Sequence, residues 1–523
     1  MDQKTYLAIS VLILFPLLAL GFAFLQNKKK QIPKIIIALI VMAFILTSLT
    51  VYFNFWKFHS IFVDNPDGEG KVELQRPFHW HEIYHYYLGS KYFSELGYFG
   101  IYNCVTAGDE ERGRLISIDY VRNLRNILTS ISHDEAVRDC DKNFKRNFTV
   151  ERWDEFKNDL NFLASIGASE WWDTAVQDAG FNPPPSSVIF SSSLSNLIPL
   201  SSQTYLLLPL LDILLLLAAT FLIFRNFGMT ALIGFVVIFG VSYIAGYFWN
   251  GGAFLRYFWL FNLIVGFSLI SQKRYFWSGL FFGISAMLRV FPLFFAVGVV
   301  VALLFDFRKN KKVLRDFVAG GAVAVFALGS LSLLIFGLDA WRDFFQHILL
   351  HKDVYFVFHI GLKKIATFAD WVPNQNFFGE AGLRLFDAWN RQLWAVWQSR
   401  LWLFLPLSFL ITAAACAATR KINLLESALL VGTTLIFLFT LPANYYFVFL
   451  SLIPLALYSQ KQNWRKHLVS LGLFGFLIFT WLAPFLSSDG IIQNFYTCCA
   501  LAIFIIWWIL LCLLPLDFLK KEI

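Results

Sequence analysis

The feature that most constrains this chain is a series of twelve long apolar runs, separated by short polar segments of which many are basic. Most runs approach the roughly 20 apolar residues that a helix needs to cross a bilayer core. With 58% hydrophobic and 15% charged residues, the chain is too apolar for a soluble domain, which carries about 25% charged residues. The same composition excludes disorder. We therefore predict an all-α, polytopic helical membrane protein.

The longest run, 275–306, exceeds what one untilted span requires, and Arg289 and Pro292 interrupt it. We interpret it as a broken hairpin of two short helices, which brings the count to 13 spans. Basic clusters such as Lys273-Arg274 and Arg308 to Lys312 then fall on one side, as the positive-inside rule requires. This topology puts the N-terminus and the large polar segments outside. The expected location is a multi-pass membrane setting, the bacterial inner membrane, with the active site facing outward.

The spans divide the chain into five regions. They are 1–54, N-terminal transmembrane helices; 55–203, an extracytoplasmic cap segment expected to be mostly helical; 204–337, a transmembrane core; 338–400, a second extracytoplasmic segment; and 401–523, C-terminal transmembrane helices. Cys104 and Cys140 both lie in the cap segment. An extracytoplasmic location permits a disulfide between them, but the sequence cannot supply its geometry, so the pairing stays open.

The net charge of +8 does not indicate nucleic acid as a partner. The basic residues stand in short clusters between apolar runs, where they signal membrane topology. The lipid bilayer is therefore the partner that the charge pattern predicts, and no nucleic acid is expected.

The densest group of titratable residues is His79-Trp80-His81-Glu82-Ile83-Tyr84-His85. It contains His81-Glu82-x-x-His85, the pattern in which two histidines on one helix face bind zinc and the glutamate acts as general base. The sequence identifies no third ligand, and the motif lies in a polar segment. A zinc-dependent membrane protease is therefore an alternative rather than the leading hypothesis.

The same segment resembles the superfamily C glycosyltransferases. Glu82, near the start of the first large outer loop, is followed by Tyr86-Tyr87 and by a helix rich in Tyr and Gly that ends in Gly100-Ile101-Tyr102. In that superfamily an Asp or Glu at this place is the general base on the acceptor hydroxyl. The resemblance implies that role for Glu82. From their proximity in the sequence we place His81 and His85 beside it in the catalytic group and His79 among the acceptor or other contacts, with His79 and His85 expected to orient Glu82 by hydrogen bonds. Many members have Asp where this chain has Glu.

A second stretch resembles the family 87 branch, which uses polyprenyl-phosphate sugars. It runs from Gly279 to Pro292 and places Arg289 where Lys is usual, and Asn250-Gly251-Gly252 stands before it in an outer loop. The resemblance implies hexosyl or pentosyl transfer from a polyprenyl-phosphate-linked sugar to a glycan, lipid or protein acceptor in the cell envelope. It leaves a divalent cation open as a cofactor, because only some members use one. No other cofactor is expected.

Physical arguments support a phosphate-binding role for Arg289. An arginine within the membrane is costly and usually faces a cavity or a partner, and a guanidinium suits a phosphate through paired hydrogen bonds. The alternative is a structural pair between Arg289 and Asp212, the ionisable residue of the run 204–224. Arg256 and Lys363 are further candidates for the donor phosphate.

The remaining candidates are weaker. His351, Asn444 and Tyr445 lie in outer segments and are expected to contact the acceptor, although interfacial aromatics and basic surface helices explain such residues equally well. A non-enzymatic lipid or solute transporter is the third hypothesis. A transporter typically shows paired broken helices in two repeated halves, whereas this sequence shows one broken run and a large cap.

Overall fold

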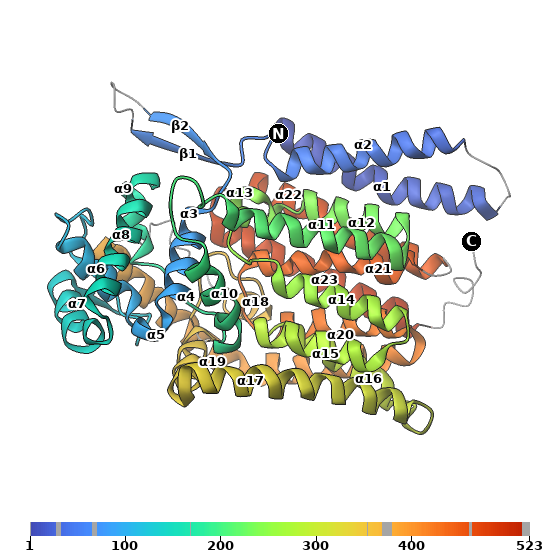
Figure 1. Cartoon of the computed structure of the whole chain (residues 1–523). Coiled ribbons are helices and arrows are strands. Elements are labelled where there is room, and N and C mark those ends of the chain that lie inside the picture. The colour runs from blue at the N-terminus through green and yellow to red at the C-terminus, as the bar shows by residue number, and fades with distance from the viewer. Residues whose placement is uncertain are drawn as a thin grey trace.

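The structure is a computed structural model, and it describes residues 2–27, 33–64, 71–167, 169–352, 354–368, 379–459 and 463–514. Long apolar helices form a bundle, and a smaller, mostly helical unit packs on one end of it (Figure 1). We call this unit the cap; it comprises the described residues between 57 and 206. The prediction of a helical, multi-pass protein with a separate polar unit is therefore supported at this coarse level.

The bundle contains helices of very different length. They are α1 (Gln3–Asn27), α2 (Lys34–Tyr52), α11 (Leu207–Phe227), α12 (Met229–Val241), η4 (Tyr243–Ala245), α13 (Tyr247–Asn250), α14 (Phe258–Ser271), α15 (Tyr275–Leu288), α16 (Pro292–Leu304), α17 (Phe307–His351), α18 (Leu362–Ala366), α19 (Gly379–Ala418), η5 (Thr419–Lys421), α20 (Leu424–Phe439), η6 (Asn444–Leu452), α21 (Ile453–Tyr458), α22 (Trp464–Leu486) and α23 (Gly490–Leu513).

Within the described ranges, seven helices are long and apolar enough to cross a membrane, or eight if the bent pair Met229–Val241 and Tyr243–Asn250 is one span. Five further apolar helices have 10 to 17 residues. These numbers indicate a membrane-embedded multi-pass protein. The count of 13 spans and the outward orientation of the cap stay predictions.

The run 275–306 is two helices, α15 and α16, as its interruption indicated. Between them Arg289 has an extended backbone, with φ −152° and ψ 140°, and Pro292 begins α16. Proline suits the first turn of a helix because its missing N–H would have no partner there. The break places Arg289 at a helix end rather than on a lipid-facing side.

Small residues let α15 approach α17 closely. A Cβ atom on Gly279 would collide with the carbonyl oxygen of Phe317, and one on Gly320 would collide with that of Phe276. Close backbone approach at glycine is typical of helices that associate within a membrane. This contact fixes α15, and with it the break that carries Arg289.

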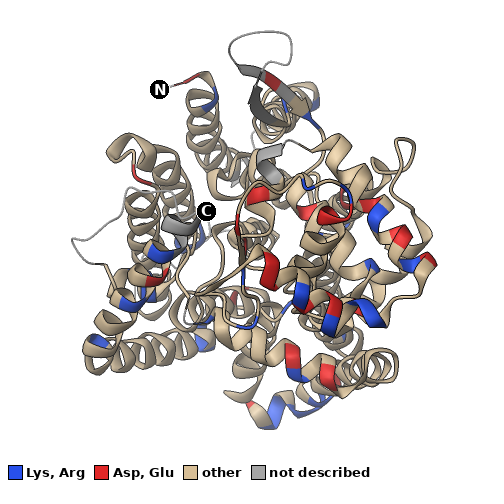
Figure 2. Ribbon diagram, turned by 90° about the vertical axis from the view of Figure 1, so that its left-hand side faces the viewer, with Lys and Arg blue, Asp and Glu red and all other residues tan. Residues whose placement is uncertain are grey.

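The cap is helical with two short hairpins. Its elements are β1 (His59–Asp64), β2 (Lys71–Arg76), α3 (Trp80–Glu82), η1 (Ile83–Leu88), α4 (Gly89–Lys91), α5 (Phe93–Leu96), α6 (Ile101–Glu110), β3 (Tyr120–Arg122), β4 (Ser130–Ser132), α7 (His133–Asp139), η2 (Cys140–Phe144), η3 (Lys145–Asn147), α8 (Val150–Ile166), α9 (Ser169–Ala175) and α10 (Pro185–Leu197). Strands β1 and β2 pair antiparallel, with His59 opposite Arg76, and β3 pairs antiparallel with β4. Figure 2 shows charged residues crowded on the cap helices, while most of the bundle ribbon carries none.

Buried ion pairs join two parts of the cap. The ammonium of Lys91 lies 2.6 Å from the carboxylate of Asp159 and 2.8 Å from that of Glu155 on α8. The hydroxyl of Tyr92 donates to Asp159 at 2.7 Å. Because Lys91 directly follows the segment that carries Glu82, these contacts anchor the candidate base to α8.

The structure joins Cys104 of α6 to Cys140 of η2 by a disulfide. The other four cysteines are free. The bond links two cap residues that are 36 positions apart in the sequence, and it connects α6 to the start of η2.

Candidate active site at the junction of cap and bundle

A cavity of about 310 Å³ lies where the cap meets the bundle. We call it the junction cavity. Its lining includes Glu82 and Tyr86 from the cap, Arg289 from the helix break, Tyr445 from η6 and His351 from the end of α17. Residues far apart in the sequence therefore converge on one enclosed space. Four of the predicted site residues line it directly with Glu82: His85, Arg289, His351 and Tyr445.

Glu82 forms an ion pair with Arg256. The side chain of Arg256 is 3% exposed and that of Glu82 is 15% exposed. A charge removed from water to this degree requires a partner, and each of these two residues is the other's counter-charge. Arg256 was expected near the donor phosphate; the structure places it directly on the candidate base.

Arg256 also carries unused hydrogen-bonding capacity. Its Nε and one terminal nitrogen are buried and have no hydrogen-bond partner among the described residues. The guanidinium stacks over the ring of Tyr445 at 4.5 Å and lies 5.6 Å from that of Tyr86. Buried N–H groups without a partner are costly, and a guanidinium is well suited to anionic oxygens. The arrangement can therefore accept an anion beside Glu82.

Asp212 of α11 holds the backbone at Arg256. Its carboxylate accepts hydrogen bonds from the backbone N–H of Arg256 at 2.9 Å and of Tyr257 at 3.0 Å. The preceding residue, Leu255, has φ +55°, a left-handed conformation that is costly for an ordinary residue. The alternative that Asp212 pairs with Arg289 is therefore wrong, because both carboxylate oxygens are engaged by the backbone before α14.

Arg289 faces the junction cavity without a carboxylate partner. Among the described residues no acidic side chain lies within ion-pair distance of it, and its guanidinium stands 5.1 Å from the ring of Tyr86. Tyr86 thus lies beside both arginines. Two guanidinium groups and the carboxylate of Glu82 thus lie around Tyr86, while the second acid of the cavity lining, Asp178, lies beside His85.

The histidines around Glu82 are held by hydrogen bonds. The Nδ1 of His79 accepts from the backbone N–H of Glu82 at 3.3 Å, and its Nε2 lies 3.0 Å from the carbonyl oxygen of Trp249. His85 contacts the carbonyl oxygen of His81 at 2.8 Å through Nδ1 and the hydroxyl of Tyr102 at 2.8 Å through Nε2. These contacts orient the start of α3 and the η1 turn.

Burial keeps two of these histidines neutral. It lowers the pKa of His79 well below its ordinary value, and it lowers that of His81 to about 4, with repulsion from His85 adding to the effect. Neutral rings beside Glu82 provide no positive charge that would compete with Arg256. Their contribution is to position the helix that carries the carboxylate.

The segment Asn250-Gly251-Gly252 supports the same helix. The backbone N–H of His79 donates to the carbonyl oxygen of Gly252 at 2.9 Å. Gly252 has φ +71°, and a Cβ there would lie 2.6 Å from the carbonyl oxygen of Pro77. Only glycine fits this position. The glycines therefore fix the start of α3 and are not among the residues that line the junction cavity.

Besides His81 and Arg256, which pairs with Glu82, three predicted site residues lie beside the junction cavity rather than in its lining. The ammonium of Lys363 donates to the carbonyl oxygen of Lys352 at 3.1 Å and lies over Trp397 at 5.5 Å. Asn444 accepts a hydrogen bond from the indole N–H of Trp249 at 2.8 Å. His79, the third, contacts the carbonyl oxygen of the same Trp249. Asn444 and His79 thus share a structural role at this loop.

Sequence reasoning did not single out two residues of the cavity, Tyr86 and Asp178. Tyr86 follows Glu82 by four residues, so helical spacing could have placed the two side chains on one face. Asp178 lies 4.0 Å from Nε2 of His85. No motif marks it, because it reaches the cavity only through the packing of the cap.

In the described part of the chain, no group of three or more His, Cys, Asp or Glu side chains is arranged to hold a metal ion. The imidazole of His81 contacts the hydroxyl of Thr174 at 3.0 Å, and both ring nitrogens of His85 are engaged in the hydrogen bonds described above. The His81-Glu82-x-x-His85 pattern is thus not organised here as a zinc site, and no observation on these residues favours the protease hypothesis.

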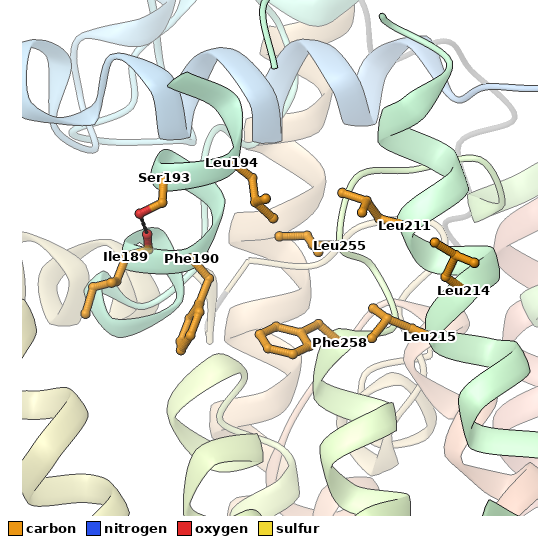
Figure 3. Close-up of a pocket in the computed structure, with 9 residues that line it drawn as sticks. All are labelled: Ile189, Phe190, Ser193, Leu194, Leu211, Leu214, Leu215, Leu255 and Phe258. Atoms are coloured by element: carbon orange, nitrogen blue, oxygen red, sulfur yellow. Dashed lines mark hydrogen bonds between the residues drawn. The ribbon is translucent and has the colours of Figure 1, made fainter. Parts of the chain in front are cut away.

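An apolar groove of about 460 Å³ lies on the bundle surface beside the cap. Figure 3 shows its side chains converging from three elements. The lining is Ile189, Phe190, Ser193 and Leu194 of α10, Leu211, Leu214 and Leu215 of α11, and Leu255 and Phe258 at the start of α14. Leu214 is 53% exposed, so the groove opens at a face that a membrane would cover.

A narrow gap of about 20 Å³ lies between this groove and the junction cavity. Leu255 and Phe258 line both the groove and the gap. Tyr86 and Arg289 line both the gap and the cavity. The groove, the gap and the junction cavity are therefore neighbours, and Arg289 lies between the groove and the cavity.

Comparison with known proteins gives no relatives: no family model, curated protein or solved structure matches the chain.

Proposed function

We propose that this protein transfers a sugar from a polyprenyl-phosphate donor to an acceptor hydroxyl. The observation that carries the proposal is the succession of an apolar groove, a narrow gap lined by Arg289, and a cavity lined by Glu82, whose carboxylate pairs with Arg256. A donor of this class has a long hydrocarbon, an anionic phosphate and a sugar, in that order. The groove, the arginines and the carboxylate follow one another in the same order.

The two arginines, Arg289 and Arg256, are suited to bind the phosphate of the donor. Arg289 lies where the groove meets the cavity and has no acidic partner among the described residues, and Arg256 has two buried nitrogens without partners. Preorganised cations of this kind stabilise negative charge that develops on a leaving group. In the proposed reaction, Arg289 and Arg256 hold the phosphate as its bond to the sugar breaks.

Glu82 is suited to act as the general base. It accepts the proton of the acceptor hydroxyl while that oxygen forms a bond to the anomeric carbon. The bond between the anomeric carbon and the phosphate oxygen breaks, and its electron pair leaves with the polyprenyl phosphate. The ion pair with Arg256 fixes the position of the Glu82 carboxylate at the wall of the cavity. Tyr445 and His351, on other walls of the cavity, are placed to contact the sugar or the acceptor.

The test is transfer by the purified full-length protein from a radiolabelled polyprenyl-phosphate sugar, supplied as a panel of hexoses and pentoses. Glu82→Gln should abolish transfer, with a loss of at least about 10²-fold, and should leave donor binding intact. Arg289→Ala should weaken donor binding. Lys363→Ala, which alters a lysine outside the cavity, is the matched control. Retention of wild-type transfer by Glu82→Gln would refute the assignment of the base.

A further inference from the structure

A second pocket, of about 680 Å³, opens on the other side of the cap–bundle contact. We call it the outer pocket. The cap contributes Glu95, Arg125 and Asn147, and the last part of α17 contributes Asp343 and Gln346. Its position depends on Gly337, where α17 breaks with φ +78° and ψ 174°, so that the residues beyond it turn over the cap.

The outer pocket is separate from the junction cavity. Tyr98 lines the outer pocket and Phe344 lines the junction cavity, and the centroids of their rings lie 5.9 Å apart. The hydroxyl of Tyr98 donates to the carbonyl oxygen of Pro183 at 2.6 Å, which fixes this wall. Neither Glu82 nor either arginine of the junction cavity lines the outer pocket.

One polar group in the outer pocket is incompletely satisfied. Glu95 accepts from the guanidinium of Arg152 at 2.9 Å through Oε1. Its Oε2 is buried and has no hydrogen-bond partner among the described residues, and the side chain is 13% exposed. A buried carboxylate oxygen without a donor is costly. A movement of the side chain that opened Oε2 to the pocket would let a ligand hydroxyl supply that donor.

The remaining lining favours a neutral ligand rich in hydroxyl groups. Two arginines, Arg125 and Arg342, face three acids, Glu95, Asp339 and Asp343, so there is no excess of positive charge for a phosphate. Amides that both donate and accept are supplied by asparagine and glutamine. The guanidinium carbon of Arg125 lies 5.9 Å from the ring centroid of Phe99 and 5.5 Å from that of Phe144.

Phe99, Phe144 and Phe336 add partly exposed aromatic surface to this polar set. A pyranose presents hydroxyl groups around its rim and C–H groups on its faces, and thus matches a pocket of carboxylates, amides and phenyl rings. We propose that the outer pocket binds a neutral saccharide unit. The source is a free glycan or the headgroup of a glycolipid, since Leu334 and Leu338 beside the pocket are 84% and 74% exposed.

The test is saturation-transfer NMR on the full-length protein in detergent, with the methyl glycosides of glucose, galactose, mannose and N-acetylglucosamine as probes. At least one should bind saturably. Ser94→Trp, which fills the pocket from an exposed position, and Gln346→Ala should each weaken that binding about tenfold or more. Ser165→Trp, at another exposed cap position outside the pocket, should leave binding unchanged.

Each other result has a defined meaning. Saturable binding that survives Ser94→Trp but is lost in Glu82→Gln would place the sugar in the junction cavity and overturn the proposal. Absence of binding by all four glycosides, and by a neutral glycosyl diacylglycerol in nanodiscs, would overturn it as well. Binding of the glycolipid alone, again blocked by Ser94→Trp, supports the pocket and assigns the lipid source. Because these measurements record binding, they hold whether or not the proposed transfer activity is correct.

Discussion

The carboxylate of Asp212 accepts hydrogen bonds from the backbone N–H groups of both Arg256 and Tyr257. Asp212 is on α11, so one buried side chain ties α11 to the turn before α14. That turn has to hold Leu255 in a left-handed conformation and aim Arg256 at Glu82. The position of the candidate base therefore depends on a residue that does not line the junction cavity.

Substitution of Asp212 tests this dependence. Asp212→Ala leaves two buried N–H groups without an acceptor and is expected to cost about 1–3 kcal/mol of stability. Asp212→Asn keeps one acceptor oxygen and should cost less. Thermal unfolding in detergent measures the difference. Equal stability of the wild type and both variants would mean that Asp212 does not hold the turn.

The Glu82–Arg256 pair makes a second prediction, which concerns stability rather than activity. Removing one member of a buried pair typically costs about 3–5 kcal/mol, because the other charge is left uncompensated. Glu82→Gln and Arg256→Met should therefore each destabilise the protein more than the double variant does. A double-mutant cycle by thermal or chemical unfolding gives the coupling energy. Additive effects would show that the two charges do not interact.

The groove makes a prediction about the hydrocarbon of the donor. Leu214→Trp fills the groove and should raise the KM for a long-chain polyprenyl-phosphate sugar roughly tenfold, which corresponds to about 1.4 kcal/mol. A short-chain analogue should be unaffected. Leu217→Trp is the control, because Leu217 lies on the same helix, is 60% exposed and does not line the groove. An equal effect of the two variants would argue against the groove.

The buried histidines outside the spans predict a loss of stability in acid. Burial lowers the pKa of His359 to about 3, with repulsion from Lys364 adding to it, and that of His81 to about 4. Their unfolded pKa is about 6.5, so protons bind the unfolded state first as the pH falls. The free energy of unfolding should be constant above about pH 6.5 and should decrease below it. The protonation of His359 alone should lower it by roughly 2 kcal/mol at pH 5.

Unfolding temperatures measured between pH 7.5 and 5 check this expectation. His359→Asn retains an acceptor for the backbone N–H of Phe356, which His359 binds through Nδ1 at 3.4 Å, but it cannot titrate. The variant should show a shallower decline than the wild type. An unchanged slope would assign the acid sensitivity to other groups.

The Cys104–Cys140 disulfide should stabilise the cap. Replacing both cysteines by alanine is expected to cost about 2–4 kcal/mol. Reduction of the wild type should lower its unfolding temperature by a similar amount and should leave the double variant unchanged. Mass spectrometry of the alkylated protein, with and without reductant, reports whether the bond forms.

The sequence predicted the bundle well because apolar length and charge position are local properties. The break at Arg289 and Pro292 is a good example, since a proline and a charge within an apolar run indicate it directly. The break residue Arg289 was identified as a charge within an apolar run, whereas the candidate base Glu82 was identified from a short motif and a family resemblance. Each of them stands in a recognisable local pattern, and the structure brings both to one cavity.

The rest of the site could not be predicted because it depends on contacts between distant segments. The Glu82–Arg256 pair joins residues far apart in the chain, and no local pattern links them. Asp212 was identified as an unusual charge, but its partners proved to be backbone N–H groups, which a sequence does not distinguish. Lys363 resembled a phosphate ligand by its charge alone, and only the packing beside Trp397 shows that it lies outside the cavity.

The opening of the groove through the side of the bundle, at Leu214, has a consequence for how the site is supplied. A molecule that enters there diffuses within the plane of the lipid and never has to expose its hydrocarbon to water. Occupancy is then governed by the number of molecules per area of membrane rather than per volume of solution. Assays that dilute the lipid phase with detergent should lower the apparent affinity in proportion, even when the bulk concentration is held constant.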